Sequence, residues 1–515
     1  MILKYKSTKS NAMWNISNYL FSLVSLFFLF PFLINNIGAA NYGFFIFLST
    51  INGIASVANF GFGEATLRYV ALYYTKGEIP TIKNILSTSL LIYIVLGVFV
   101  GFIVYLLAPQ ISDLLKEKSI DSETAIYLIR VSAVTFVVRF TFGIFAMVPQ
   151  AIQRFDISSK ITIGETILRV ALYVIVILKG YGLEGLVYSE LILALIYVFV
   201  NYFITSTIFK KLWFLGKFSK ALFKQIFSYS IYAALSQILG LLWQYTDRIL
   251  LGYFIGSAAI AYFSVPQQII FKFLGVITAG SAVLFPKFSV DKINEDIKLI
   301  FKKYTLLFLM FSIILFSTLS LIIPEFLELW ISPEFAAQSK DIAIILAISC
   351  MIRGAFPVYQ NLFKGINKPV YNLYIIIASS LTIVILDFIL IPQFGLKGAG
   401  IAYLLSPLAG VVTIYFIYTK LFKESIRQPL LLLLVPLLIG YITFILGFYF
   451  KTYLNYQIGW VSMILTSVVF PLLLGGLLII YFNRFSKKHI EVISVFQIKQ
   501  LSGLINTFTS KISKN

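Results

Sequence analysis

The sequence predicts an all-α membrane protein whose helices cross the bilayer many times. Of its 515 residues, 59% are hydrophobic and only 12% are charged, whereas soluble proteins carry about 25% charged residues. Fourteen apolar runs are long enough to span a bilayer core, which needs about 20 residues per helix. Large apolar side chains are also too abundant for a disordered chain. These observations exclude a soluble enzyme and an intrinsically disordered protein.

The apolar runs define fourteen predicted spans, the first of which is too long for a secretory signal peptide. In chain order they lie near residues 14–37, 42–62, 85–108, 126–148, 157–178, 183–207, 228–251, 258–283, 304–323, 340–361, 369–391, 398–419, 429–450 and 458–482. The connections between them are shorter than about twenty residues, which is too short for a soluble catalytic domain between two membrane helices.

The spans predict four parts of the chain. Six spans form an N-terminal lobe over residues 1–210, and six more form a C-terminal lobe over residues 211–425. Two extra helices occupy residues 426–482. In residues 483–515, apolar side chains recur near helical spacing and basic residues flank them, which indicates a cytoplasmic amphipathic tail on the membrane surface.

An internal repeat relates the two predicted lobes. Each of three segments in the first half has a similar segment 210 to 218 residues later. The pairs are Ile37-Gly38-Ala39-Ala40 with Ile255-Gly256-Ser257-Ala258, Gln150 and Arg154 with Gln360 and Lys364, and Gly182-Leu183-Glu184-Gly185 with Gly395-Leu396-Lys397-Gly398. Each unit has an even number of spans, so both units enter the membrane in the same orientation and are predicted to be related by a pseudo-twofold axis along the membrane normal. This layout is typical of transporters, with a binding site between the lobes and alternating access through rocking of the lobes.

The charge of the chain sets its predicted orientation. There are 41 Lys and Arg residues against 21 Asp and Glu residues, for a net charge of +20. Such an excess can attract nucleic acid, but a chain this apolar indicates a membrane protein instead, and we expect no nucleic-acid partner. Basic residues gather in the even-numbered connections and at both ends, which predicts that both termini are cytoplasmic.

Cysteine and histidine each occur once, as Cys350 and His489. A single cysteine excludes an internal disulfide, and a single histidine in the basic tail indicates a surface side chain. The inventory provides no His/Cys metal cluster. We therefore expect neither a cofactor nor a catalytic centre.

Several arginines and lysines fall inside the predicted spans, where a charge is costly and marks a functional hypothesis. Arg139, Lys272 and Arg353 have no acid three or four residues away on their own helix. We expect each to face a cavity, an acid on another helix or a bound anion. Because a guanidinium bonds two phosphate oxygens at once, these residues predict a central cationic cavity. The alternative is a structural ion pair between helices, such as Arg353 with Asp387.

Two further arginines are weaker candidates for the cationic cavity. Arg68 lies four residues after Glu64, as Arg169 lies four residues after Glu165, and such pairs can neutralise themselves on one helix. Arg248 is adjacent to Asp247, so the two side chains are expected to point in different directions.

Two acids inside the spans are candidates for ion coupling. Asp387 lies in the middle of the eleventh span without a basic residue on its own helix, and Asp247 lies at the end of the seventh. A carboxylate in this setting can bind a proton or Na⁺, which would couple transport to an H⁺ or Na⁺ gradient. A complete ligand set for Na⁺ is not evident in the sequence.

The motifs around these charges resemble a known transporter family. Ile37-Gly38 and Tyr42-Gly43, then Phe60-Gly61-Phe62-Gly63 and Arg68-Tyr69, are similar to the start of Wzx-type polysaccharide-lipid flippases, as is Asp247-Arg248-Ile249-Leu250-Leu251-Gly252 followed by Ala261-Tyr262. These flippases belong to the multidrug/oligosaccharidyl-lipid/polysaccharide exporter (MOP) superfamily, which includes the multidrug and toxin exporters (MATE transporters). The resemblance extends over the whole chain.

The resemblance implies a function and its partners. Such proteins carry an undecaprenyl-pyrophosphate-linked oligosaccharide, as for O-antigen, capsule or exopolysaccharide, from the inner to the outer leaflet of the bacterial cytoplasmic membrane. The sugar and pyrophosphate pass through a basic cavity, and the last two helices help to guide the lipid tail. Relatives that bind Na⁺ near the seventh and eleventh helices make Asp247 and Asp387 candidates. We expect a monomer in membrane lipid that can associate with polysaccharide polymerase or assembly proteins.

Two alternatives remain open at this point. A MATE-type drug/cation antiporter has twelve spans and uses embedded acids, whereas here the deep charges without a local partner are mostly basic; a drug phenotype on deletion with intact surface polysaccharide would favour it. A polysaccharide polymerase or ligase usually carries a large outer loop with catalytic groups, which the predicted connections lack.

Overall fold

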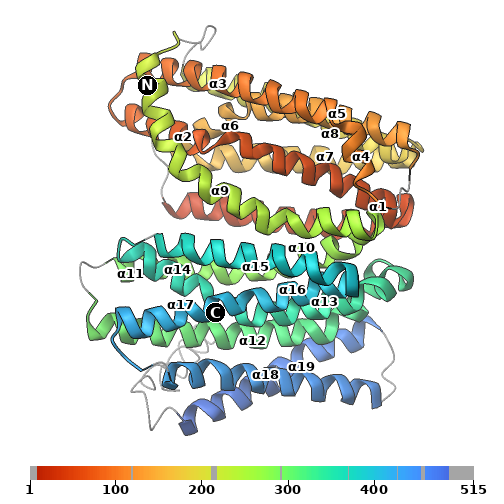
Figure 1. Ribbon diagram of the computed structural model, residues 1–515, viewed down its shortest axis with the longest axis vertical. Coiled ribbons are helices and arrows are strands. Elements are labelled where there is room, and N and C mark those ends of the chain that lie inside the picture. Colours follow the sequence, from red (N-terminus) through yellow and green to blue (C-terminus); the bar gives the residue numbers. More distant parts are fainter. Residues whose placement is uncertain are drawn as a thin grey trace, which may run out of the picture. The chain divides into compact units, whose positions relative to one another are not determined.

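The computed structural model describes residues 8–116, 120–209, 217–289, 293–368, 370–425, 427–453 and 459–485, and over these residues the chain is helical, with no strand (Figure 1). Twelve helices or helix pairs within the described residues are long and apolar enough to cross a membrane. The predicted all-α multi-pass membrane fold is therefore confirmed, while the exact number of fourteen spans stays a prediction. The last helix runs to Phe485, so it includes the first three residues of the tail predicted at 483–515, and residues 486–515 lie outside the described residues.

The helices of the first half follow the predicted spans closely, and most boundaries differ by a few residues. They are α1 (Thr8–Ala55), η1 (Ser56–Asn59), α2 (Phe62–Thr75), α3 (Ile79–Leu106), α4 (Ala108–Asp113), α5 (Ser122–Phe142), α6 (Ile144–Ala151), α7 (Phe155–Leu178), α8 (Gly182–Ile208) and α9 (Lys220–Phe254). The first predicted span and most of the second fall within α1, which is interrupted at Gly38, where the backbone leaves the helical region (φ 81°, ψ 157°). The predicted seventh span lies in α9, which is not among the twelve membrane candidates.

The second half repeats this order of elements. It contains α10 (Ser257–Ser281), η2 (Ala282–Leu284), α11 (Phe285–Phe288), α12 (Glu295–Trp330), α13 (Pro333–Arg353), α14 (Phe356–Gly365), α15 (Val370–Phe394), α16 (Leu396–Leu405), η3 (Ser406–Leu408), α17 (Ala409–Phe416) and η4 (Ile417–Leu421). The extra helices are α18 (Arg427–Tyr453) and α19 (Trp460–Phe485).

The backbone supports the internal repeat at the residues that suggested it. Gly38 and its counterpart Gly256 both have positive φ, at 81° and 136°, and Gly182 and Gly395 have φ of 50° and 59°. Glycine adopts these angles without the steric penalty that a Cβ imposes. The helices of the two halves are therefore interrupted at equivalent positions. Gln153 and Asn367 also match, because each lies two residues after a helix end and has a φ of 57°.

Helix ends in the first half are set by local chemistry. Asp121 precedes α5, and its Oδ2 accepts a hydrogen bond from the backbone N–H of Thr124 at 2.8 Å. This capping bond stabilises the carboxylate and lowers the pKa of Asp121. Arg154 precedes α7 and donates two hydrogen bonds to Asp156, at 2.8 and 3.0 Å. The bonds to Asp156 raise the pKa of Arg154.

The contacts divide the chain into two compact units. The first unit comprises Met1–Ile269, Leu327–Ile342 and Leu373–Ser406, and the second comprises Ile270–Phe326, Ala343–Asn372 and Pro407–Asn515. Several helices, such as α10 and α13, contribute to both units. The predicted lobe boundaries at 210 and 425 are a different division and stay a prediction.

In the first unit, α1, α3, α5, α7 and α8 form the scaffold of the candidate site. α3 packs on α5, α5 on α8, α8 on α7 and α7 on α1 (Figure 1). A buried apolar cluster joins α2, α3 and α6, with Ile82, Ile85 and Leu86 fully shielded from solvent. Truncation of one of these side chains would leave a cavity and destabilise the packing of α2, α3 and α6.

The second unit has an aromatic core of its own. Phe301 of α12 is fully buried, and its ring lies near those of Tyr359, Tyr418 and Phe422 at 5.3 to 6.2 Å between centroids. α18 and α19 pack against each other. Lys451 near the end of α18 forms an ion pair of 2.7 Å with Glu325 of α12, which ties α18 to α12.

Candidate functional site

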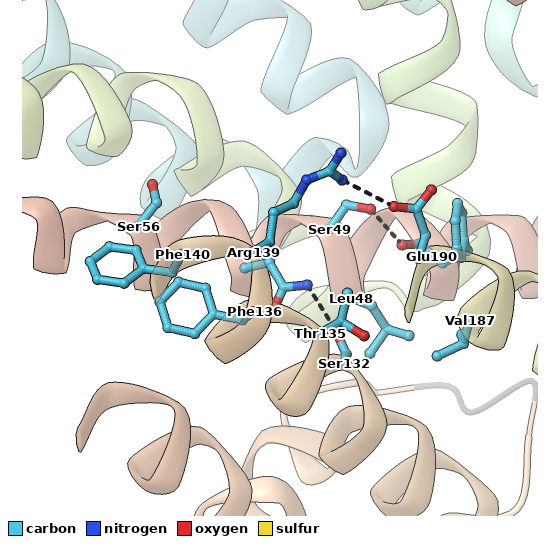
Figure 2. Close-up of a pocket in the computed structure, with 12 residues that line it drawn as sticks. Leu48, Ser49, Ser56, Ser132, Thr135, Phe136, Arg139, Phe140, Val187 and Glu190 are labelled. Atoms are coloured by element: carbon cyan, nitrogen blue, oxygen red, sulfur yellow. Dashed lines mark hydrogen bonds and ion pairs between the residues drawn. The ribbon is translucent and has the colours of Figure 1, made fainter. Parts of the chain in front are cut away.

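A cavity of about 320 Å³ opens in the first unit between α1, η1, α5 and α8 (Figure 2). Its lining combines aromatic side chains, hydroxyl and amide groups and two charged residues. The lining residues are Phe45, Leu48, Ser49, Asn52, Ser56, Ser132, Thr135, Phe136, Arg139, Phe140, Val187 and Glu190. A mostly apolar wall with a few convergent polar groups is characteristic of small-molecule sites. Arg139 therefore lines a cavity, which is one of the three environments that the sequence predicts for it.

Arg139 also meets acids on other helices. Its guanidinium hydrogen-bonds Glu165 of α7, and its Nη1 lies 3.4 Å from Oε2 of Glu190 on α8. In Figure 2 the guanidinium points toward Glu190. The ring of Tyr197 lies 5.1 Å from the guanidinium carbon, at a distance that permits a cation–π contact. Arg139 thus satisfies two of its predicted environments at once.

A second arginine completes the ion network. Arg169 of α7 forms the predicted pair with Glu165 on its own helix, at 2.8 Å, and a further ion pair with Glu190, at 3.0 Å. The hydroxyl of Tyr173 donates to Glu190 at 2.5 Å. Two arginines and two glutamates from α5, α7 and α8 therefore form a network with no net charge. Such a network avoids the large cost of an isolated charge in a membrane interior.

The hydroxyl and amide groups of the cavity are partly committed to the protein. Asn52 donates from Nδ2 to Oγ of Ser132 at 2.9 Å, while its own Oδ1 is buried without a hydrogen-bond partner among the described residues. Ser49 donates to the carbonyl of Phe45 at 3.1 Å. Thr135 donates to the carbonyl of Val131 at 3.0 Å. These groups retain lone pairs that a ligand can use.

A second polar cluster in the first unit forms around Asp247. Oδ1 of this buried carboxylate accepts a hydrogen bond from the backbone N–H of Arg248 at 2.7 Å, and Oδ2 accepts one from Gln267 at 2.9 Å. Gln267 also accepts a bond from Arg248 at 3.2 Å and donates to the hydroxyl of Tyr403 at 2.9 Å. The expectation that the side chains of Asp247 and Arg248 point apart is wrong, because both side chains converge on Gln267.

Asp387 of α15 differs from every other acid in this region. Its side chain is fully buried, and neither carboxylate oxygen has a hydrogen-bond partner among the described residues. Asp247 lies close enough for the two carboxyl groups to repel each other electrostatically. A buried ionised carboxylate without a partner is very unfavourable, so this group requires a proton or a cation.

The remaining predicted site residues are placed in both units. Arg68 of α2 is exposed and lies 5.9 Å from the ring of Tyr69. Lys272 and Arg353 belong to the second unit, where Lys272 is half-buried and Arg353 is buried with Nε 3.3 Å from Oγ of Ser349. Within the first unit, the structure joins Arg248 to Asp247 through Gln267 and joins Arg139 to two acids. Within the described residues, no group of three His, Cys, Asp or Glu side chains could hold a metal ion.

The sequence reading did not anticipate the cross-helix partners. The bonds from Arg139 to Glu165 and Glu190 join residues that are 26 and 51 positions apart in the chain. A comparison of depths along the predicted spans would have suggested these pairs, because an unpaired arginine and an acid at similar depths on neighbouring helices tend to meet. Asn52, Ser132 and Gln267 carried no sequence signal, since neutral polar residues occur throughout the spans.

The sequence matches a known protein family over more than half of its length. The family model described as "Polysaccharide biosynthesis protein" matches residues 5–290, which is more than half of the chain. The chain belongs to the polysaccharide biosynthesis protein family. Within and around this family, the chain is 21% identical over 425 residues to the protein named "Putative O-antigen transporter" of Shigella flexneri. That match covers 80% of this chain and 97% of the relative.

This member of the polysaccharide biosynthesis protein family shares its fold with membrane transporters of known structure. The lipid II flippase MurJ, in an inward closed conformation, matches with a TM-score of 0.71 at 15% identity, covering 93% of this chain and 99% of that one. An inward-facing MATE transporter of the MOP superfamily matches with a TM-score of 0.57 at 17% identity, over 80% and 94% of the two chains. These structures confirm the predicted MOP-like fold of the chain.

Proposed function

We propose that the chain is a flippase that moves an undecaprenyl-pyrophosphate-linked oligosaccharide repeat unit from the inner to the outer leaflet of the bacterial cytoplasmic membrane. The observation that carries this proposal is the family match over residues 5–290 on a MOP-type helical membrane fold. The curated relative named as an O-antigen transporter and the lipid II flippase fold both support a lipid-linked glycan as the cargo. Alternating access moves the cargo, and no covalent step is needed.

We assign the anionic headgroup to the arginines and lysines inside the spans. Arg68, Arg248, Lys272 and Arg353 are the proposed set, and a guanidinium offers two parallel N–H bonds to a phosphate. Arg139, the fifth residue of the predicted set, is left out of this assignment. Arg139 shares its charge with Glu165 and Glu190, so it contributes less net attraction than its formal charge implies. Buried Arg353 is the stronger candidate for a direct contact with pyrophosphate, since a buried guanidinium favours an anionic partner.

A groove in the second unit supports a path for the lipid tail. α12, α18 and α19 enclose an apolar space of about 770 Å³, whose wall includes Leu446, Phe450, Val469 and Leu473. Apolar surface of this kind suits a polyprenyl chain, and Lys451 at its edge is neutralised by Glu325. We therefore assign the lipid tail to α18 and α19, as proposed for the two extra helices.

We assign ion coupling to Asp247 and Asp387 of the first unit. Asp387 lacks any hydrogen-bond partner among the described residues, and Asp247 lies near it. Uptake of H⁺ or Na⁺ at Asp387 would remove an unfavourable buried charge, and release would restore it. Binding and release of the ion at Asp387 would couple the ion gradient to transport, because the inward-facing and outward-facing states would differ in their affinity for the ion.

A reconstitution experiment tests the proposed function. Purified protein in liposomes should expose a fluorescent polyprenyl-pyrophosphate-linked glycan to an external reagent at least tenfold faster than protein-free liposomes. Deletion of the gene should abolish surface glycan display without changing drug susceptibility. Normal display with a drug phenotype would favour the MATE-type antiporter, and lengthening of the glycan by the purified protein would favour a polymerase or ligase.

A further inference from the structure

The cavity of the first unit offers a ligand no net charge. Its two charged lining residues, Arg139 and Glu190, belong to the network that also contains Arg169 and Glu165. The two positive and two negative charges cancel within a few ångströms. A pyrophosphate would have to compete with two carboxylates for Arg139, and it would be repelled by Glu190. The cavity is therefore a poor site for the anionic part of a lipid-linked glycan.

The polar groups of the cavity mostly present hydrogen-bond acceptors. Ser49, Ser56 and Thr135 each donate their hydroxyl proton to a backbone carbonyl of their own segment, at 3.1, 2.5 and 3.0 Å. Their oxygen lone pairs remain available. Asn52 adds a buried carbonyl oxygen that has no partner among the described residues. An acceptor of this kind costs free energy until a donor reaches it.

Size and shape restrict the ligand further. A volume of about 320 Å³ is at the lower end of the range for small-molecule sites, about 300 to 1,000 Å³. Phe45, Phe136 and Phe140 provide aromatic surfaces beside the polar groups. A sugar ring matches this combination, because its C–H face packs on aromatic rings while its hydroxyl groups donate hydrogen bonds around the edge.

We propose that this cavity binds a neutral sugar residue of the lipid-linked glycan, and that it rejects acidic sugars and the pyrophosphate. The inference rests on the proposed flippase function and names the chemistry of one part of its cargo. Sugar hydroxyls donate to Asn52, Ser49, Ser56 and Thr135. A uronic acid would instead bring a carboxylate, which has no proton to donate, toward these acceptors and toward Glu190. Discrimination therefore comes from repulsion as well as attraction.

The test measures the affinity of three synthetic lipids for the full-length protein in lipid nanodiscs. They are polyprenyl pyrophosphate alone, the same lipid bearing one glucose, and the same lipid bearing one glucuronic acid. The glucose lipid should bind about tenfold more tightly than the bare lipid, as expected for a few additional hydrogen bonds. The glucuronic acid lipid should bind no more tightly than the bare lipid. Equal affinity for the two sugar lipids would overturn the proposal.

Matched variants locate the effect in the cavity. Asn52→Leu should remove the advantage of the glucose lipid and leave the affinity for the bare lipid unchanged. Asn36→Leu is the control, because Asn36 is exposed on the same helix and its amide donates to the carbonyl of Phe32. Thr135→Val retains the shape of the side chain and should weaken glucose-lipid binding if Asn52→Leu fails to fold. Equal weakening of both lipids in a folded variant would contradict the sugar assignment.

The same titrations separate this inference from the function on which it rests. If the glucose and bare lipids bind wild-type protein equally well, the sugar assignment fails and the flippase proposal stands. If none of the three lipids binds, the proposed cargo is wrong and the sugar assignment fails with it.

Discussion

Glu190 illustrates how single residues of this protein stabilise several helices at once. On α8 it accepts hydrogen bonds from Tyr173 of α7 and Arg139 of α5 and forms an ion pair with Arg169 of α7. Glu165 makes the parallel pair of contacts to the same two arginines. Removal of either acid leaves an arginine with incomplete neutralisation, and the cost of an uncompensated buried charge exceeds the net value of the pair.

The change Glu165→Gln tests this network. It retains the size of the side chain but removes the charge between Arg139 and Arg169, and we expect a loss of about 2 kcal/mol in stability, as for a hydrogen bond to a charged group. The measurement is thermal unfolding of purified protein in detergent. Glu184→Gln is the control, because Glu184 is an exposed acid in the first turn of α8. Equal melting temperatures for both variants would show that the network adds no stability.

Asp387 is the residue at which coupling is expected. Asp387→Asn removes the ionisable group without changing the shape of the buried side chain, so stability should be unchanged or higher. The transport rate in liposomes should lose its dependence on an imposed H⁺ or Na⁺ gradient. A variant that responds to the gradients like the wild type would exclude Asp387 from coupling. Glu64→Gln, an exposed substitution on α2, controls for the loss of a carboxylate.

At the scale of elements, glycine allows two helices to approach closely. A Cβ at Gly43 of α1 would lie 1.8 Å from the backbone oxygen of Ser257 in α10, and 3.3 Å from the backbone nitrogen of Ala261. Backbone atoms cannot move aside as a flexible side chain can. The contact between α1 and α10 therefore depends on the absence of a side chain at Gly43, one of the positions in the motif Tyr42-Gly43.

Gly43→Val should prevent this approach and destabilise the first unit. The clash exceeds that of ordinary overpacking, which costs about 1–3 kcal/mol. We expect a large loss of monodisperse protein in size-exclusion chromatography. Gly164→Val on α7 is the matched control, because a Cβ at Gly164 meets nothing within 4 Å. If both variants elute like the wild type, the close approach of α1 and α10 is not required for assembly.

The apolar groove of α12, α18 and α19 provides a second test at the scale of elements. Gly476 lines this groove, and a Cβ there meets nothing within 4 Å. Gly476→Phe should occupy the groove and slow translocation of a long-chain polyprenyl lipid by about tenfold, with little change for a lipid with a short chain. Gly164→Phe places the same ring outside the groove. Similar rates for long-chain and short-chain lipids would contradict the role of the groove.

At the scale of the whole molecule, the two repeats carry charge differently. Arg139 and Arg353 lie 214 residues apart, each in the last turn of the equivalent helices α5 and α13. At the same offset of 214 residues, the counterparts of Glu165 and Glu190 are Ser379 and Leu404, which carry no carboxylate. The first repeat thus contains a neutral ion network, and the second has kept the arginine without those acids.

The charge distribution also predicts the orientation of the whole chain. Cys350 is buried, and in a Cys350→Ala background a single cysteine can report on one connection at a time. A cysteine at Lys76 should be protected from a membrane-impermeant thiol reagent in intact cells. A cysteine at Asp121 should react, because the connection after α4 is rich in acids and is expected to be outside. The reverse pattern would invert the predicted topology.

The sequence by itself determined the helical membrane fold and the repeat. Apolar runs of sufficient length require helices in a bilayer, since only a helix satisfies its own backbone hydrogen bonds there. The repeated glycines marked breaks that the backbone indeed shows at Gly38 and Gly256. Both signals are local in the chain. The sequence also identified Arg139 and Asp387 as unusual, because Arg139 has no acid three or four residues away and Asp387 has no basic residue on its own helix.

The tertiary structure alone decided what these side chains meet. Arg139 reaches Glu165 and Glu190 across three helices, whereas Asp387 has no hydrogen-bond partner among the described residues. Asp247 and Arg248 converge on Gln267 although they are neighbours in the chain. These outcomes depend on the rotation of each helix about its axis and on its depth beside its neighbours. Packing of many side chains sets both quantities, and no pattern within one helix encodes them.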